Sequence, residues 1–177
     1  GDIDIVVAHQ VDVLWWYEND GNNDFEGSAS TMLAWGGNCD CSGFVSGSSS
    51  PTIDAPVSVN IIDFDGDGDN DVVMGSEYDD RVAWFEGDGS GSFSGHTITT
   101  NADGVRSINA LDFDRDGDID VLVSSMNSNE VSWFENDGSE SFTEHLISDS
   151  STRPYSISAG DFDGDGDTDV VTANVGE

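Results

Sequence analysis

Residues 63–71 read DFDGDGDND, which places five aspartates at alternate positions of a nine-residue segment. The same register returns at residues 112–120 and again at residues 161–169, at intervals of 49 residues. Residues 1–4 match the last four positions of the segment, so a truncated copy opens the chain. A fixed period near 50 residues indicates a propeller, a solenoid or another repeat array.

The rest of the repeat keeps the same period. Trp84 precedes Phe85 and Glu86, an Asp-Gly pair follows at 88–89, and His96 comes later. The equivalent residues of the other repeats are Trp16, Tyr17 and Glu18, then Trp133, Phe134, Glu135 and His145. The Asp-Gly pair is a hairpin turn signal, because Gly tolerates positive φ.

Each repeat therefore predicts four short strands. In the second repeat they cover residues 57–62, 71–74, 81–86 and 92–99, and Val59 and Ile61 are the inner positions of the first strand. Four strands joined by short turns form the blade of a β-propeller. We expect an all-β fold of four-stranded antiparallel blades, with the acidic loop between the first and second strands and no helix.

The period also divides the chain. We expect a truncated first repeat at 1–51 with an insertion at about 29–50, complete repeats at 52–100 and 101–149, and a partial repeat at 150–177. Propellers close with roughly four to eight blades. The ends are in phase with each other, so we expect a segment of a longer array. Its end sheets would be completed by flanking sequence or by an adjacent copy, as a ring or a fibre.

The composition excludes several functions. The 177 residues carry 37 acidic side chains against four arginines and no lysine, a formal net charge of −33. Nucleic acid and anionic membrane surfaces need clustered basic residues, so neither is an expected partner. No apolar run is long enough to insert into a membrane.

The aspartate loop carries the clearest chemistry. Calcium takes six to eight oxygen ligands, and alternate aspartates can wrap it. Positions 1, 3, 5 and 9 would supply carboxylates, position 7 its backbone carbonyl, and Gly68 at position 6 the sharp turn. An EF-hand would need Glu at position 12, where this chain has Met74, Val123 and Thr172. A solvated acidic turn is disfavoured, because the carboxylates would repel; magnesium is an alternative that prefers a tighter shell.

These loops and their spacing resemble the FG-GAP/VCBS repeat family, which includes the calcium-binding blades of integrin α-subunit propellers. The Trp-aromatic-Glu segment resembles VCBS-type repeats of secreted microbial and algal proteins. The resemblance implies an extracellular, calcium-stabilised propeller that serves adhesion or ligand binding, with three calcium sites. It assigns metal roles to Asp63, Asp65, Asp67, Asp69, Asp71, Asp112, Asp114, Asp116, Asp118, Asp120, Asp161, Asp163, Asp165, Asp167 and Asp169.

One loop departs from the pattern. Arg115 stands where the other two loops have Gly66 and Gly164. If this position requires positive φ, Arg115 is strained and the middle site is weaker.

Other residues have both structural and functional interpretations. The periodic tryptophans and histidines are expected to pack within and between blades, although tryptophans also stack on sugars. Trp15 and Trp35 fall outside the periodic pattern and are better candidates for ligand contact. The periodic glutamates could form a glycosidase dyad, but repetition in every blade favours a structural role.

The single cysteine pair lies in the insertion. Cys39 and Cys41 are two residues apart, so a disulfide between them would be strained, and whether they are oxidised stays open. No Asn-x-Ser/Thr sequon occurs, while serine and threonine are abundant enough for O-glycans.

Two classes of function remain. The first is an extracellular, non-enzymatic calcium-binding scaffold for adhesion or structural assembly, including fibres, whose partners are calcium and further repeats or copies of the chain. The second is a lectin-like carbohydrate-binding module, attached to a secreted polysaccharide-degrading enzyme. A carbohydrate or a protein ligand is compatible with either.

Overall fold

The computed structural model describes residues 5–9, 13–17, 30–35 and 53–176, and these residues form only β-strands, turns and loops. The first sheet contains β1 (Ile5–His9), β2 (Val13–Tyr17) and β3 (Ser30–Trp35). The second contains β4 (Pro56–Ile62), β5 (Asp71–Ser76), β6 (Arg81–Gly87) and β7 (Phe93–Thr99). The third contains β8 (Val105–Leu111), β9 (Asp120–Ser125), β10 (Glu130–Asn136) and β11 (Phe142–Ser148). The last contains β12 (Pro154–Gly160) and β13 (Asp169–Asn174).

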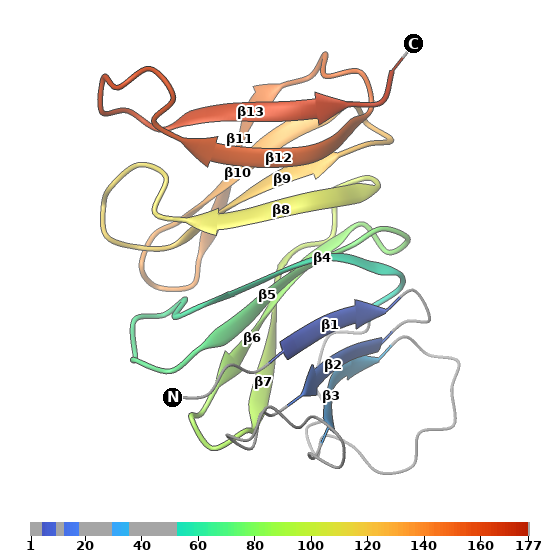
Figure 1. Ribbon diagram of the computed structural model, residues 1–177, viewed down its shortest axis with the longest axis vertical. Helices are drawn as coiled ribbons and strands as arrows, with labels where there is room; N and C mark the ends of the chain where they lie inside the picture. Colours follow the sequence, from blue (N-terminus) through green and yellow to red (C-terminus); the bar gives the residue numbers. More distant parts are fainter. Residues whose placement is uncertain (1–4, 10–12, 18–29, 36–52, 177) are drawn as a thin grey trace.

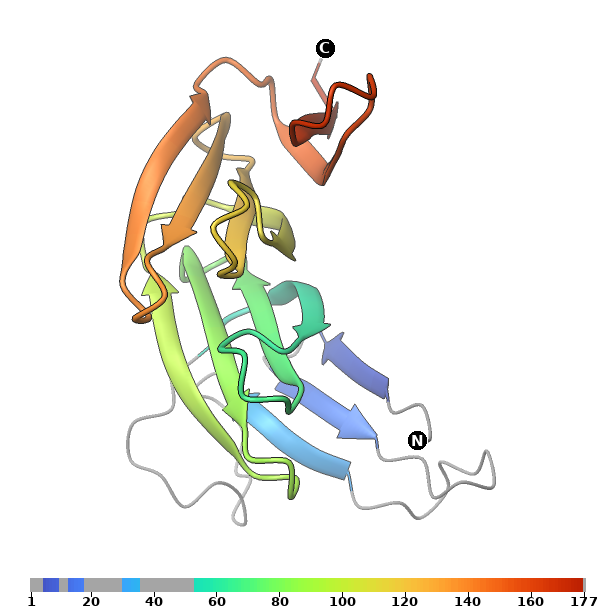
Figure 2. The same ribbon diagram turned by 90° about the vertical axis from the view of Figure 1, so that its left-hand side faces the viewer.

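Within each sheet, consecutive strands pair antiparallel in chain order. The sheets follow one another along the long axis of the molecule (Figure 1). Seen from the side they fan out along an arc, with β7 and β11 at its convex edge and β4, β8 and β12 on the opposite side (Figure 2). The predicted antiparallel blades are thus present, while the sheets of the described chain do not close into a ring.

The middle strands are buried on both faces because neighbouring sheets cover them. Every residue of β5 and of β9 is buried, which explains why the central residues 72–74 and 121–123 are apolar without alternation. Trp84 is fully buried and shares one core with Val105, Ile108 and Val121 of the next sheet. This confirms inter-blade packing for Trp84.

The first strands are edge strands, and side chains of the preceding sheet pair with their backbone. The Asn60 side-chain oxygen accepts the Ala110 N–H at 2.9 Å, and the Asn109 side-chain oxygen accepts the Ala159 N–H at 3.2 Å. Each bond joins one first strand to the next. Unpaired backbone donors are costly when water is excluded, so these asparagines hold the sheets in register with one another.

Two details differ from the sequence-based expectation. Strand β3 lies within residues 29–50, which the repeat register assigned to an insertion, and it pairs with β2. Ile61, expected to face inward, is 49% exposed, whereas Val59 on the same strand is half-buried and packs against the core. Cys39 and Cys41 lie outside the described residues.

Candidate metal centres

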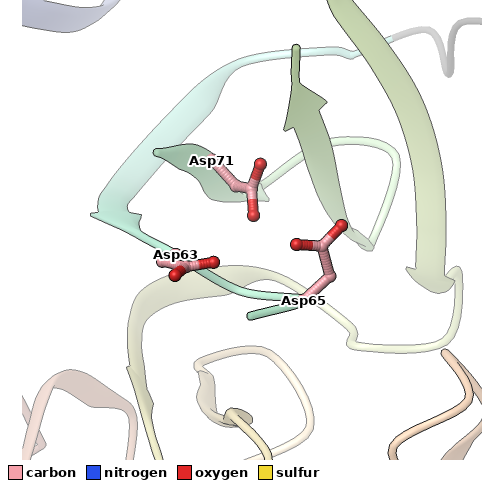
Figure 3. Close-up of side chains that lie close together, drawn as sticks. All are labelled: Asp63, Asp65 and Asp71. Atoms are coloured by element: carbon pink, nitrogen blue, oxygen red, sulfur yellow. The ribbon is translucent and has the colours of Figure 1, made fainter. Parts of the chain in front are cut away.

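Each acidic loop joins the first strand of a sheet to the second. In the second sheet Asp63 and Asp65 follow β4, while Asp71 is the first residue of β5. Their side chains point toward a common centre (Figure 3). One carboxylate oxygen from each lies within 4.8 Å of the other two. The fold therefore brings together three of the five aspartates expected in this loop.

The same geometry recurs in the other two loops. Asp112, Asp114 and Asp120 form the second cluster, and Asp161, Asp163 and Asp169 form the third, each with the same 4.8 Å limit. These residues occupy positions 1, 3 and 9 of the loop. The recurrence shows that the arrangement follows from the repeated sequence.

Position 5 and position 7 lie outside the clusters. The Asp65 carboxylate accepts the Asp67 N–H at 3.1 Å, and the Asp67 carboxylate accepts the Asp69 N–H at 2.8 Å, so the chain winds through two successive Asx turns. Gly66 and Gly68 have φ values of 79° and 99°, which only glycine adopts readily. The roles of Asp67, Asp116 and Asp165 at position 5, and of the Asp69, Asp118 and Asp167 carbonyls at position 7, stay predictions.

Position 9 anchors the loop to the rest of its sheet. Asp71 is fully buried and accepts two backbone N–H groups, one from Phe64 at 2.8 Å and one from Gly87 at 2.7 Å. Asp120 repeats this with Phe113 and Asn136. Each buried aspartate thus ties the acidic loop to the end of the third strand.

Burial raises the pKa of the Asp71 and Asp120 carboxyls, although their backbone hydrogen bonds oppose the shift. A neighbouring aspartate, Asp65 or Asp114, adds to the increase by Coulomb repulsion. Both causes disfavour the ionised carboxylate when no positive charge is near. A bound cation would reverse the balance.

Position 1 provides the test of whether a cation fits. One carboxylate oxygen of Asp63 and one of Asp112 are buried and accept no hydrogen bond. A buried carboxylate oxygen without a partner is costly. In both loops the unpaired oxygen belongs to a residue of the cluster, so a cation there would supply the missing partner. The donors are all hard oxygens, which suit calcium or magnesium.

The third loop is more open. Its cluster residues are exposed or half-exposed, and Phe162 beside them is 61% exposed, whereas the equivalent Phe64 is 3% exposed. Phe64 packs against Trp84 with ring centroids 5.0 Å apart, and Phe113 packs against Trp133 at 4.9 Å. Phe162 has no third strand of its own sheet among the described residues, so less of this loop is shielded from water.

Arg115 has the positive φ on which the expectation of a strained middle loop depended. Its φ is 68°, close to the 79° of Gly66 and the 81° of Gly164. A residue with a β-carbon is strained there by roughly 1–2 kcal/mol. The middle loop therefore carries the expected strain, while a weaker middle site remains a prediction.

The other candidate residues have structural partners. His96 and His145 pair with Glu86 and Glu135 and stack on Trp84 and Trp133. This pairing supports a structural role for the periodic glutamates. The side chains of Trp15, Trp16 and Trp35, and the whole of Glu18, lie outside the described part of the chain.

Sequence reasoning missed the backbone donors that hold position 9. Gly87 and Asn136 each lie 16 residues after the aspartate that they bind, across the third strand. It also missed Glu140, which contacts the preceding sheet. A signal for Glu140 was present, since this acidic residue replaces the glycine of the preceding repeat, Gly91.

The family comparison agrees with this geometry. The model of the FG-GAP-like repeat matches residues 63–123 and residues 112–172, each match running from one acidic loop through the second strand of the following repeat. No curated protein matches the chain. The two matches together cover more than half of the sequence and include all three aspartate clusters. The chain therefore belongs to the FG-GAP-like repeat family.

Proposed function

We propose that this protein is an extracellular, non-enzymatic scaffold of calcium-binding repeats that serves adhesion or structural assembly. One observation carries the proposal: each of three repeats brings three carboxylates together, and in two of these clusters the position 1 aspartate has a buried oxygen without a hydrogen-bond partner. Carboxylates so placed favour a divalent cation over any neutral ligand.

Calcium is the better fit of the two hard cations. Each loop offers more oxygens than the three in its cluster, since the position 5 carboxylate and the position 7 carbonyl lie on the same turn. Calcium accepts six to eight ligands in flexible geometry, whereas magnesium demands a near-ideal octahedron with several waters. Extracellular calcium modules work at dissociation constants of about 10⁻⁴–10⁻³ M, which suits partly exposed loops.

An extracellular setting is part of the proposal. The family membership supports it, because repeats of this kind are typically extracellular. In the part of the chain that the structure describes, no helix has the length and apolar character needed to cross a membrane.

Assembly through further repeats, or through other copies of the chain, is part of the proposal. Phe162, Val171 and Val175 on and beside β13 are 61%, 50% and 48% exposed. Their positions are covered in the complete sheets, where Phe64 and Leu122 are almost fully buried. A third strand from further repeats, or from an adjacent copy, would cover this surface and pair the free edge of β13.

A lectin-like module is the second candidate, and exposed aromatic residues favour it. Tyr78 is 70% exposed and Tyr155 is 51% exposed. The Arg106 guanidinium lies 5.5 Å from the centre of the Tyr155 ring and pairs with Glu77, the neighbour of Tyr78. Aromatic rings with adjacent polar groups can stack on sugars. Binding on a glycan array that Tyr78→Ala and Tyr155→Ala abolish would support this candidate, and its absence would exclude it.

Calcium stoichiometry tests the main proposal. Isothermal titration of the wild-type protein with calcium should give three sites. Asp63→Asn, Asp112→Asn and Asp161→Asn should each give two, because each removes a position 1 carboxylate. Asp149→Asn is the matched control, since it changes the net charge equally at an exposed aspartate outside the clusters. No binding by the wild type, or an unchanged stoichiometry in the three loop variants, would contradict the proposal.

A further inference from the structure

His96 lies between carboxylates from two different sheets. Its Nε2 is 3.1 Å from Glu86 Oε2 on β6 of the same sheet. Its Nδ1 is 3.7 Å from Glu140 Oε2, in the turn between β10 and β11 of the next sheet. The imidazole stacks on the buried Trp84 ring, with centroids 4.6 Å apart and planes inclined by 21°. The stack fixes the ring plane, so each nitrogen faces one glutamate.

This arrangement selects one protonation state. A neutral imidazole has one donor nitrogen and one acceptor nitrogen, whereas the imidazolium has two donors. A neutral ring would therefore turn a lone pair toward one of the two carboxylates. Only the charged ring is attracted to both, through a hydrogen bond to Glu86 at 3.1 Å and an ion pair with Glu140 at 3.7 Å. Histidine is the side chain whose charge changes nearest to neutral pH, so a contact that needs the charged ring is a candidate for a proton-dependent switch.

The backbone of Glu140 gives a second, independent observation. Its φ is 61°, in the left-handed region. The equivalent residue of the preceding sheet is Gly91, whose φ is 89°. A residue with a β-carbon is strained in this conformation. Strained backbone of this kind is enriched at functional contacts, and the Glu140 side chain is the one that reaches His96.

The third sheet provides an internal comparison. His145 stands at the register position of His96, stacks on Trp133 at 4.6 Å and pairs with Glu135 at 2.5 Å. Among the described residues, Glu135 is the only carboxylate that pairs with His145. The histidine–glutamate pair within a sheet is thus repeated, while the contact to the following sheet is made by His96 alone in the described chain.

Other charges near this contact have the same sign as the two glutamates. Glu86 comes from β6 and Glu140 from the β10–β11 turn. Glu140 also lines a pocket of about 310 Å³ between the two sheets, together with Asp65, Asp67 and Asp118. When the loops hold no cation, these negative charges add to the attraction of the two glutamates for a charged ring.

We propose that His96 and Glu140 form a proton-dependent latch between the second and third sheets. Protonated His96 bridges Glu86 and Glu140 and fastens the turn of one sheet to the outer strand of the other. The sign follows from the charge: the latch is formed at mildly acidic pH and released as His96 loses its proton. The side chains are 34–50% exposed, so the effect is modest.

A double-mutant cycle tests the latch. His96→Gln, Glu140→Gln and the double variant are melted in saturating calcium at pH 5.5 and pH 8.5. At pH 5.5 each single variant should lower the melting temperature by about 1–4 °C, and the double variant should fall no further. At pH 8.5 the coupling should vanish. The control cycle pairs His145→Gln with Glu140→Gln and should be additive at both pH values.

A second pair of measurements keeps the test independent of any packing change caused by His96→Gln. Glu140→Gly restores the residue of the preceding repeat and relieves its backbone strain, so it should raise the melting temperature more at pH 8.5 than at pH 5.5, where the lost latch offsets part of the gain. Hydrogen exchange of the turn at 137–141 should be faster in Glu140→Gln than in the wild type at pH 5.5. A coupling no larger at pH 5.5 than at pH 8.5, including none at either, overturns the latch.

Discussion

Replacing Asp63 with Asn should shift stability in opposite directions with and without calcium. In the absence of a cation, Asp63, Asp65 and Asp71 hold carboxylate oxygens within 4.8 Å of one another. Each pair of unit charges at that distance repels by about 0.9 kcal/mol in a water-like dielectric. The Asn side chain keeps the shape and removes two of the three repulsions. Salt at about 0.1 M screens the gain to roughly 1 kcal/mol.

In calcium the same change removes a binding site. At a free calcium concentration about 100 times the dissociation constant, one site stabilises the fold by about 2.7 kcal/mol. The variant loses this and keeps the gain from reduced repulsion, a net loss of about 1.7 kcal/mol. For a chain of this size, 1 kcal/mol corresponds to roughly 2–4 °C. Asp63→Asn should therefore melt about 2–4 °C higher than the wild type in chelator and about 3–7 °C lower in calcium.

Differential scanning calorimetry in matched buffers, with calcium or with EDTA, measures both shifts. Asp112→Asn should behave in the same way, because its loop has the same cluster and the same buried, unpaired oxygen. Asp149→Asn controls for the change in net charge, and its melting temperature should differ little from that of the wild type in either buffer. A shift of the same sign in both buffers would refute the reasoning, as would a response equal to that of the control.

Three further outcomes are expected. Gly68→Ala should lower the melting temperature by about 2–8 °C, because the φ of 99° is strained for alanine although a β-carbon there would meet no atom within 4 Å. The control Gly160→Ala is equally open and has no left-handed φ, so its melting temperature should hardly change. Equal effects of the two substitutions would remove the conformational explanation. Gly75→Ala should lower the free energy of unfolding, measured by chemical denaturation, by about 1–3 kcal/mol, because its β-carbon would lie 2.5 Å from a methyl of the buried Val105 in the next sheet. An unchanged unfolding midpoint would show that this contact is loosely packed. Hydrogen bonds from Ser92 and Ser90 lower the pKa of Asp88 to about 2. The stability that this carboxylate contributes is therefore present above pH 3.8 and is lost as the pH falls toward 2. A titration of the Asp88 carboxyl ¹³C signal with its midpoint near pH 4 would contradict this.

The terminal sheet shows how far pattern reasoning extends. Residues 161–171 repeat residues 63–73 almost letter for letter, and the three aspartates of this loop converge in the same way. Yet Phe162 is exposed where Phe64 is buried. Burial depends on strands and sheets that cover a residue, and these belong to other parts of the chain. The sequence pattern therefore predicted the loop geometry but not its shielding from water.

The first sheet illustrates a different limit. The repeat register placed residues 29–50 in an insertion, yet β3 pairs with β2 within that segment. Strand pairing is set by which edge is free to accept hydrogen bonds, and an edge strand need not keep the spacing of its repeat. In this irregular repeat, the period therefore did not predict the position of the strand.

The sequence by itself determined the period, the antiparallel sheets and the clustering of aspartates in the loops. Positions 1, 3 and 9 are close in the chain, and turn-forming glycines bring them together by local geometry. Tertiary structure decided what joins distant segments. It set how Asp71 is held, because one of its two backbone donors is Gly87 at the end of the third strand, 16 residues away in the chain. It also placed Glu140 beside His96, since a contact between separate sheets depends on how the sheets stack, and no short-range pattern encodes that.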